Sequence, residues 1–137
     1  MSLEMLKSVV TTVVLALALG QALGMAQVRG WVRLLPVEKR RLRQWHRWGG
    51  IATLVLALAV AAICVFAIGG RYTSYSPRVL AHLHMGGLAI LVLLLKVAIT
   101  NRFRRYLRYH TALGITAGLL ILGTFVASAL WYFVQVA

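Results

Sequence analysis

The chain has 137 residues, of which 61% are hydrophobic and only 12% are charged, and its mean hydropathy is +0.85. A soluble domain usually has a charged fraction of about a quarter, so these values exclude an ordinary soluble fold. Fifteen Lys and Arg stand against two acids, for a formal net charge of +13. The basic residues interrupt apolar runs, so we expect anionic lipid headgroups, and not nucleic acid, as their counter-charge.

Four apolar runs are long enough to cross a bilayer, and they cover residues 6–28, 48–69, 79–100 and 111–133. About 20 apolar residues in a helix span the hydrocarbon core, and lipid offers the backbone no other hydrogen-bond partners. The connections are short, so neighbouring helices should run antiparallel. We therefore predict an all-α fold, a membrane-spanning up-down four-helix bundle that forms one domain over residues 1–137.

Two segments have a second interpretation. The first run follows Lys7 as the core of a signal peptide would, but its apolar stretch is longer than such a core, so we expect a retained helix.

Residues 29–47 mix cations with Trp31, Leu34 and Leu35. That composition suits a short interfacial helix with Pro36 near its start, and a solvated basic loop is the alternative.

The basic residues of the connections predict an orientation. The first and third connections carry eleven Lys and Arg, whereas the second carries Arg71 and Arg78. By the positive-inside rule the first and third connections are cytoplasmic and both termini are outside, in a bacterial cytoplasmic (inner) membrane. The eleven residues are Arg29, Arg33, Lys39, Arg40, Arg41, Arg43, Arg47, Arg102, Arg104, Arg105 and Arg108. Aromatic belts are expected at Trp45, Trp48, Tyr106 and Tyr109 inside, and at Tyr72, Tyr75, Trp131 and Tyr132 outside.

All four histidines stand at the beginnings of spans. His46 begins the second span, His82 and His84 the third, and His110 the fourth. Because alternate spans run in opposite directions, His46 and His110 share the cytoplasmic side, and His82 and His84 lie near the outer face.

The His46 and His110 pair suits a haem. A haem b in a helix bundle needs two imidazoles at one depth on different helices, with small residues beside them. Gly50 and Gly114 each follow a histidine by four residues, on the same helix face. We predict haem b between the second and fourth spans, with His46 and His110 as axial ligands. The arginines expected to meet its propionates are Arg43, Arg47, Arg105 and Arg108.

The outer histidines give a less complete pattern. His82 and His84 project about 200° apart on one helix, so they do not ligate one iron from both faces. Gly86 and Gly87 stand beside them. A second haem held by His82 or His84, a quinone site and a purely structural role are the alternatives. Lys96 either extends to the interface or meets a haem propionate or a quinone oxygen.

Three stretches carry a resemblance to a known family. Residues 45–50 (Trp-His-Arg-Trp-Gly-Gly), residues 82–87 and the His110-x-x-x-Gly114 motif resemble the haem-bearing helices of small transmembrane b-type cytochromes, including the ferric-reductase-like group. The resemblance covers the second to fourth spans. It implies bis-histidine haem b and electron transfer with quinones, other cytochromes or a soluble partner. The chain departs from diheme members because it lacks a second histidine deeper in the same helix.

The leading functional hypothesis is a membrane electron-transfer subunit with haem b near the cytoplasmic face. It would work within a larger respiratory or photosynthetic complex or take electrons from the quinone pool, as an electron carrier or a quinol-linked oxidoreductase subunit. The alternative is a haem-free accessory subunit that stabilises a membrane protein complex. A third possibility is a membrane-surface anchor that uses the basic connection.

Overall fold

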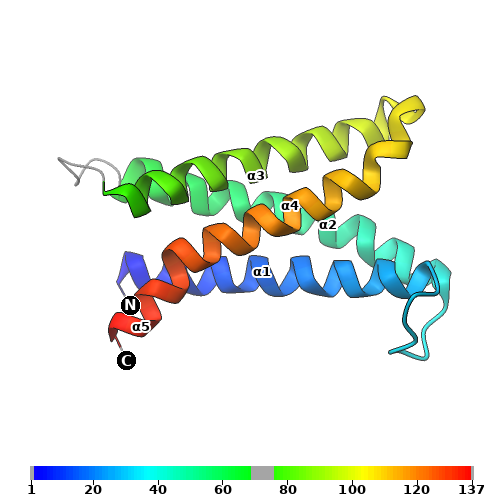
Figure 1. The fold of residues 1–137 in the computed structure, drawn as a ribbon, viewed down its shortest axis with the longest axis horizontal. Coiled ribbons are helices and arrows are strands. Elements are labelled where there is room, and N and C mark those ends of the chain that lie inside the picture. Colours follow the sequence, from blue (N-terminus) through cyan, green and yellow to red (C-terminus); the bar gives the residue numbers. More distant parts are fainter. Residues whose placement is uncertain (1, 69–75, 137) are drawn as a thin grey trace.

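The computed structural model describes residues 2–68 and 76–136, in which all regular secondary structure is helical (Figure 1). The order is α1 (Leu3–Val28), α2 (Lys39–Ala62), the π-helical turn η1 (Ile63–Ile68), α3 (Pro77–Asn101), the 3₁₀ segment η3 (Arg104–Tyr109), α4 (His110–Phe125), the π-helical turn η4 (Val126–Leu130) and α5 (Trp131–Val136). The all-α prediction is confirmed. The predicted end of the second span at Gly69, the basic residue Arg71 and the aromatic residues Tyr72 and Tyr75 lie outside the described residues.

Within the described ranges, four helical stretches are long and apolar enough to cross a membrane: Leu3–Val28, Lys39–Ala67, Pro77–Asn101 and Arg104–Gln135. The second and fourth stretches each join several elements, because η1 continues α2 and because η4 and α5 continue α4. The chain is therefore a multi-pass membrane protein, with a lipid bilayer as its environment.

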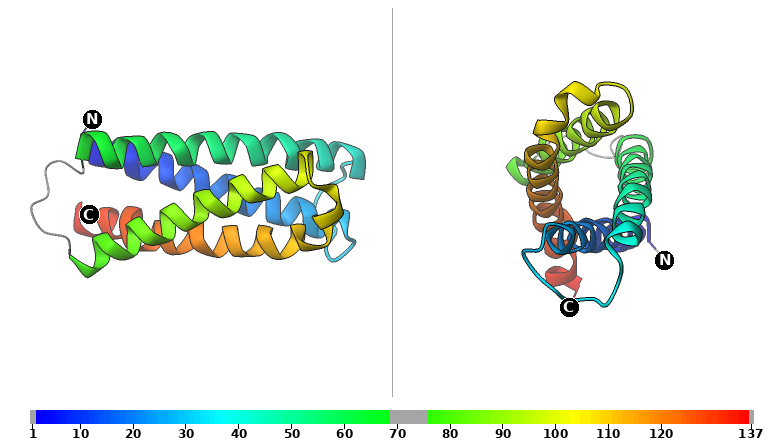
Figure 2. Two further views of the ribbon diagram at one scale, coloured as in Figure 1. Left: turned by 90° about the horizontal axis from the view of Figure 1, so that it is seen from above. Right: turned by 90° about the vertical axis from the view of Figure 1, so that its right-hand side faces the viewer.

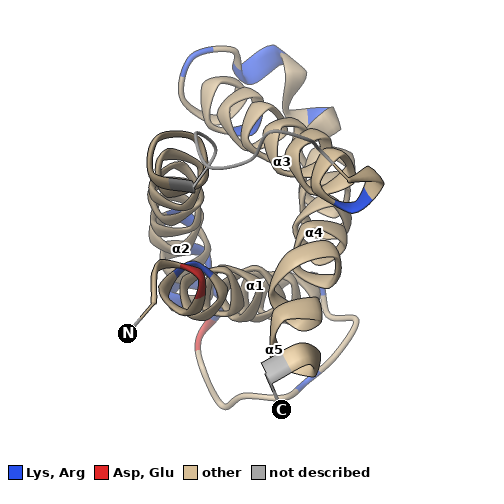
Figure 3. Cartoon of the chain, turned by 90° about the vertical axis from the view of Figure 1, so that its left-hand side faces the viewer, with Lys and Arg blue, Asp and Glu red and all other residues tan. Residues whose placement is uncertain are grey.

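The four long helices form an up-down bundle. α1 packs against α2 and α4, and α3 packs against α4 and α2, so each helix has two neighbours and α2 lies diagonally across from α4 (Figure 2). Both chain termini lie at one end, which we call the terminal end, and residues 29–38 and 102–109 lie at the other, which we call the basic end (Figure 1). Figure 3 views the bundle from the terminal end.

Side chains and glycine fix where the helices begin and end. The Ser2 hydroxyl accepts a hydrogen bond from the Met5 amide at 3.1 Å, which caps the start of α1. Ser76 does the same for the Val79 amide at 3.4 Å, with Pro77 as the first residue of α3. After α1, Gly30 has a φ of 79°, a left-handed conformation that favours glycine at a helix end.

The segment between α1 and α2 is a loop and not the short interfacial helix that was one of the two sequence interpretations. No separate helix begins at Pro36; residues 32–38 have no regular structure, and α2 begins at Lys39. The Gln27 side-chain oxygen accepts hydrogen bonds from the Leu34 amide (3.2 Å) and the Leu35 amide (2.9 Å), and its nitrogen donates to the Leu35 carbonyl. These bonds hold the segment as a loop, so the cations from 39 to 47 lie on the first turns of α2.

The bundle interior contains mostly small and aliphatic side chains. The buried core cluster consists of Val14, Ala89, Leu93, Ala117 and Ile121. Small residues let helix backbones approach closely in a membrane, where helices gain little from apolar burial alone. Two hydroxyls of the last span bond to the helix itself: Thr124 donates to the Leu120 carbonyl at 2.8 Å, and Ser128 donates to the Thr124 carbonyl at 2.9 Å.

Candidate functional site

The structure brings His46 and His110 together across the bundle. His46 lies in the second turn of α2 and His110 is the first residue of α4, so the two rings approach from diagonal helices. Their centroids are 5.9 Å apart with an angle of 66° between the planes. Both rings line a cavity of about 370 Å³, which we call the basic-end cavity. This volume falls within the range of cofactor and small-molecule sites.

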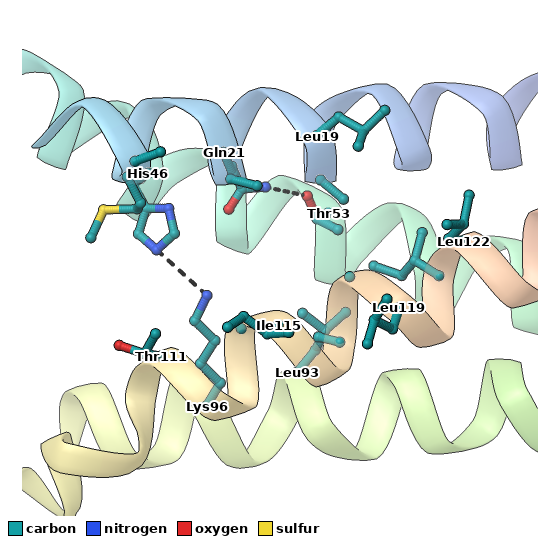
Figure 4. A pocket seen from close by; sticks show the side chains of 18 of the residues that line it. Leu19, Gln21, His46, Thr53, Leu93, Lys96, Thr111, Ile115, Leu119 and Leu122 are labelled. Atoms are coloured by element: carbon teal, nitrogen blue, oxygen red, sulfur yellow. Dashed lines mark hydrogen bonds between the residues drawn. The ribbon is translucent and has the colours of Figure 1, made fainter. Parts of the chain in front are cut away.

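Lys96 enters the same cavity from α3. Its amino nitrogen lies 3.5 Å from Nε2 of His46 (Figure 4), so the side chain points into the bundle rather than along its outer surface. The cavity lining contains four basic side chains, Arg29, His46, Lys96 and His110, and no acidic residue among those described. The remaining lining is mostly apolar, so the cavity combines positive charge with a low-dielectric wall.

The glycines beside the histidines leave room for polar side chains. A Cβ at Gly114 would meet the Lys96 amino nitrogen at 3.5 Å, and one at Gly50 would meet the Gln21 side-chain oxygen at 3.5 Å. Gly49 is tighter, because its Cβ would lie 3.3 Å from Gln21. Gln21 donates to the Thr53 hydroxyl at 2.7 Å. The predicted notches at Gly50 and Gly114 therefore border Gln21 and Lys96.

The four arginines expected near propionates lie elsewhere. Arg43, Arg47, Arg105 and Arg108 are exposed, and none lines the basic-end cavity. Arg105 and Arg108 instead stack on the rings of the tyrosines that follow them, at 4.7 Å from each centroid. The arginine that reaches the cavity is Arg29, which donates a hydrogen bond to the Thr111 hydroxyl. Arg29 directly follows α1, and its side chain reaches across to α4.

The outer histidines diverge, as the 200° angle predicts. His84 is exposed, and its Nδ1 donates to the Leu80 carbonyl at 2.7 Å. His82 points inward, where its Nε2 lies 3.8 Å from the Cys64 sulfur. Neither is near His46 or His110, because they lie at the terminal end. Gly86 packs against Thr124, and a Cβ at Gly87 would have no heavy atom within 4 Å. No second histidine of the described residues faces His82, so this end offers one imidazole to a ligand.

The spacing of the two imidazoles in the basic-end cavity matches that of a pair of metal ligands. Two imidazoles on opposite faces of a metal hold their centroids roughly 6 Å apart, because each metal–nitrogen bond is about 2 Å long. The observed 5.9 Å separation of the His46 and His110 rings agrees with that spacing. Nδ1 of His46 is buried and has no hydrogen-bond partner among the described residues, and binding of a metal through Nε2 would not change that. Lys96 would have to leave Nε2 of His46 for that nitrogen to bind iron.

Sequence reasoning missed two members of this site, Gln21 and Arg29, and left open whether Lys96 extends to the interface or meets a ligand inside the bundle. A signal for Gln21 was present, because it is a glutamine inside the first run and lies nearer the middle of that run than the other one, Gln27. Arg29 was counted with the loop cations because it directly follows that run. The rotation of α3 that turns Lys96 inward depends on packing against α4, which the sequence pattern does not specify.

The comparisons with known proteins concern the whole chain. No curated protein and no solved structure matches it. The match to DUF6529, a family of unknown function, spans residues 1–137, and the chain therefore belongs to that family.

Proposed function

We propose that this protein is a membrane electron-transfer protein that binds haem b between His46 and His110. The observation that carries the proposal is the pair of imidazoles from diagonal helices, 5.9 Å apart at the wall of one cavity. A third helix supplies Lys96 to the same cavity. The resemblance of residues 45–50 and of the His110-x-x-x-Gly114 motif to b-type cytochromes supports the same assignment.

The residues around the pair suit a redox centre. A haem bound there would accept and return single electrons. Leu93, Ala117 and Ile121 exclude water from the interior side of the cavity, which strengthens every charge interaction within it. Lys96 and Arg29 place positive charge at the cavity wall. Cations favour the reduced form of a haem, because that form carries one more negative charge.

The fold also suits a carrier more than a complete enzyme. The four spans and their connections account for the described residues, and the ionisable side chains that line the site are Arg29, His46, Lys96 and His110. We propose that the protein exchanges electrons with a membrane quinone or with other subunits of a respiratory or photosynthetic complex. By the basic-residue count, we place the basic end on the cytoplasmic side of a bacterial cytoplasmic membrane, with both termini outside.

The test is the visible spectrum of the protein expressed with adequate haem supply. We expect a low-spin b-type spectrum that is lost in His46→Ala and in His110→Ala, since either change removes an axial ligand. His84→Ala is the matched control, because this exposed ring points away from the bundle, and it should keep the spectrum. If haem is lost in His82→Ala but kept in His46→Ala, the proposed pair is wrong. A haem-free protein that co-purifies with a membrane complex would favour the accessory-subunit alternative.

A further inference from the structure

A second cavity lies at the terminal end, far from the His46 and His110 pair. It has a volume of about 380 Å³ and is lined by residues of α1, η1, α3, η4 and α5; Figure 3 looks onto this end of the bundle. Both π-helical turns contribute to its wall, η1 through Cys64 and η4 through Ser128. Such turns are rare and are frequent at functional sites. Their convergence on one cavity indicates a binding site.

The polar side of this terminal-end cavity suits an anion. Its lining includes Lys7 and Arg78 as well as Glu4, so these three side chains together carry a charge of +1. The Arg78 guanidinium lies 5.0 Å above the Trp131 ring, which holds it in place. A positioned guanidinium matches the two oxygens of a carboxylate or phosphate.

His82 places a further polar group at the same cavity. Its Nε2 lies 3.8 Å from the Cys64 sulfur, and the tautomer of the ring decides which of the two donates. Its Nδ1 is buried and has no hydrogen-bond partner in the described part of the chain. An unpaired buried polar group is unfavourable. With the ring proton on Nδ1, an oxygen of a bound ligand would satisfy it.

An apolar cavity adjoins the polar one. A neighbouring cavity of about 300 Å³ shares Cys64, Val65, His82 and Leu83 with it. The rest of the second lining is mostly aliphatic, with Val14, Ile90 and Gly87 among its residues. A ligand that fills both spaces has a polar head and one apolar chain.

We propose that the terminal-end cavities bind a single-chain amphiphile with an oxyanion head, either a carboxylate or a phosphate. The head lies against Arg78, Lys7 and His82, and the chain lies in the neighbouring apolar cavity. This inference does not depend on haem binding, because the two sites share no polar lining residue and only one apolar one, Ile121.

Trp131 gives a direct test, because it lines the cavity while the other tryptophans, Trp31, Trp45 and Trp48, belong to the basic end. With those three replaced by Phe, brominated single-chain ligands are titrated into the haem-free protein in neutral phosphatidylcholine nanodiscs. We expect saturable quenching of Trp131 by a brominated fatty acid or a brominated lysophosphatidate. The brominated alcohol of equal chain length should bind at least about tenfold more weakly, as the loss of a charged hydrogen bond predicts.

The two acids distinguish the source of the ligand. Tighter binding of the fatty acid assigns a free carboxylate, and tighter binding of the lysophosphatidate assigns a lipid phosphate; either result supports the proposal. Equal binding of the alcohol, or quenching that does not saturate with any probe, overturns it.

Variants then locate the two parts of the ligand. Arg78→Gln and His82→Gln should each weaken binding of the acids by roughly tenfold and leave that of the alcohol unchanged. His84→Gln, on the exposed face of the same helix, is the matched control. Gly87→Leu should block the chain of both probe types, since its Cβ enters open space and does not disturb the fold. Parent-like affinity in both Arg78→Gln and His82→Gln would overturn the assignment of the head group.

Discussion

The amino group of Lys96 lies 3.5 Å from Nε2 of His46, one of the two ring nitrogens through which an imidazole binds a metal. Lys96 comes from α3, whereas the proposed second ligand, His110, comes from α4. The basic-end cavity is therefore a three-helix arrangement of nitrogen-bearing side chains, in which Lys96 would compete with the iron of the proposed haem for the same ring atom.

Lys96→Met tests this competition. Loss of the competing amino group should leave haem binding as tight as in the parent or tighter. The midpoint potential should fall by roughly 50–100 mV, because removal of a nearby cation destabilises the reduced form by about 1–2 kcal/mol. Redox titration measures the shift, and Lys39→Met, at the exposed start of α2, is the control. Loss of haem in Lys96→Met would mean that this lysine holds the cofactor itself.

Arg29 should influence the haem more than the arginines that the sequence singled out. Arg29 lines the cavity, whereas Arg47 and Arg108 lie outside its lining. All three side chains are exposed, and because solvent screens exposed charges strongly, the charge nearest the haem should have the largest effect. We expect Arg29→Gln to lower the midpoint potential by tens of mV, at most about the 59 mV that corresponds to a tenfold change in a one-electron equilibrium. Arg47→Gln and Arg108→Gln should change the potential little. The reverse order would restore the two exposed arginines as propionate partners.

Thr53→Val tests the contact between α1 and α2. Thr53 is buried, and its hydroxyl accepts the Gln21 amide at 2.7 Å while donating to the Gly49 carbonyl at 2.8 Å. Valine keeps the shape but leaves Gln21 without this acceptor, so we expect a loss of about 1 kcal/mol in the free energy of unfolding. Reversible unfolding in mixed micelles measures it. Thr12→Val removes an exposed hydroxyl that bonds only within α1, and it should cost less than half as much.

Cysteine labelling tests the orientation. In a Cys64→Ser background, Ser76→Cys should react with an impermeant thiol reagent in intact cells, because it lies at the terminal end, which we place outside. Arg102→Cys should react only after the membrane is permeabilised, because it lies at the basic end. Both positions are exposed, so their difference reports on the side of the membrane. Labelling of Arg102→Cys in intact cells would invert the assignment.

The fold could be predicted closely because the bilayer allows few choices. Runs of about 20 apolar residues in lipid must form helices, and short connections make them antiparallel. The start of the second helix was predicted too late, at residue 48, because its first turns are rich in cations; α2 begins at Lys39. A helix that extends beyond the hydrocarbon has no apolar pattern to mark its start.

The site could be predicted in part. The shared depth of His46 and His110 follows from the alternating direction of the spans, and the structure brings the two rings together. The rotation of each helix about its own axis does not follow from depth. That rotation turns Lys96 inward and leaves Arg43 and Arg47 on the surface, and it is set by packing between helices. Arg105 and Arg108 are exposed because they lie on the connecting segment η3.

The π-helical turn η4 gives the last helix two registers. A π turn accommodates one residue more than an α turn, and each residue of an α-helix advances the side-chain direction by about 100°. Trp131 and Gln135, which follow η4, therefore face the terminal-end cavity only because of that additional residue. Deletion of one residue from Val126–Leu130 would return the helix to a single α-helical register. It would rotate every later side chain away from Arg78 and leave the His110 half of the same helix unchanged.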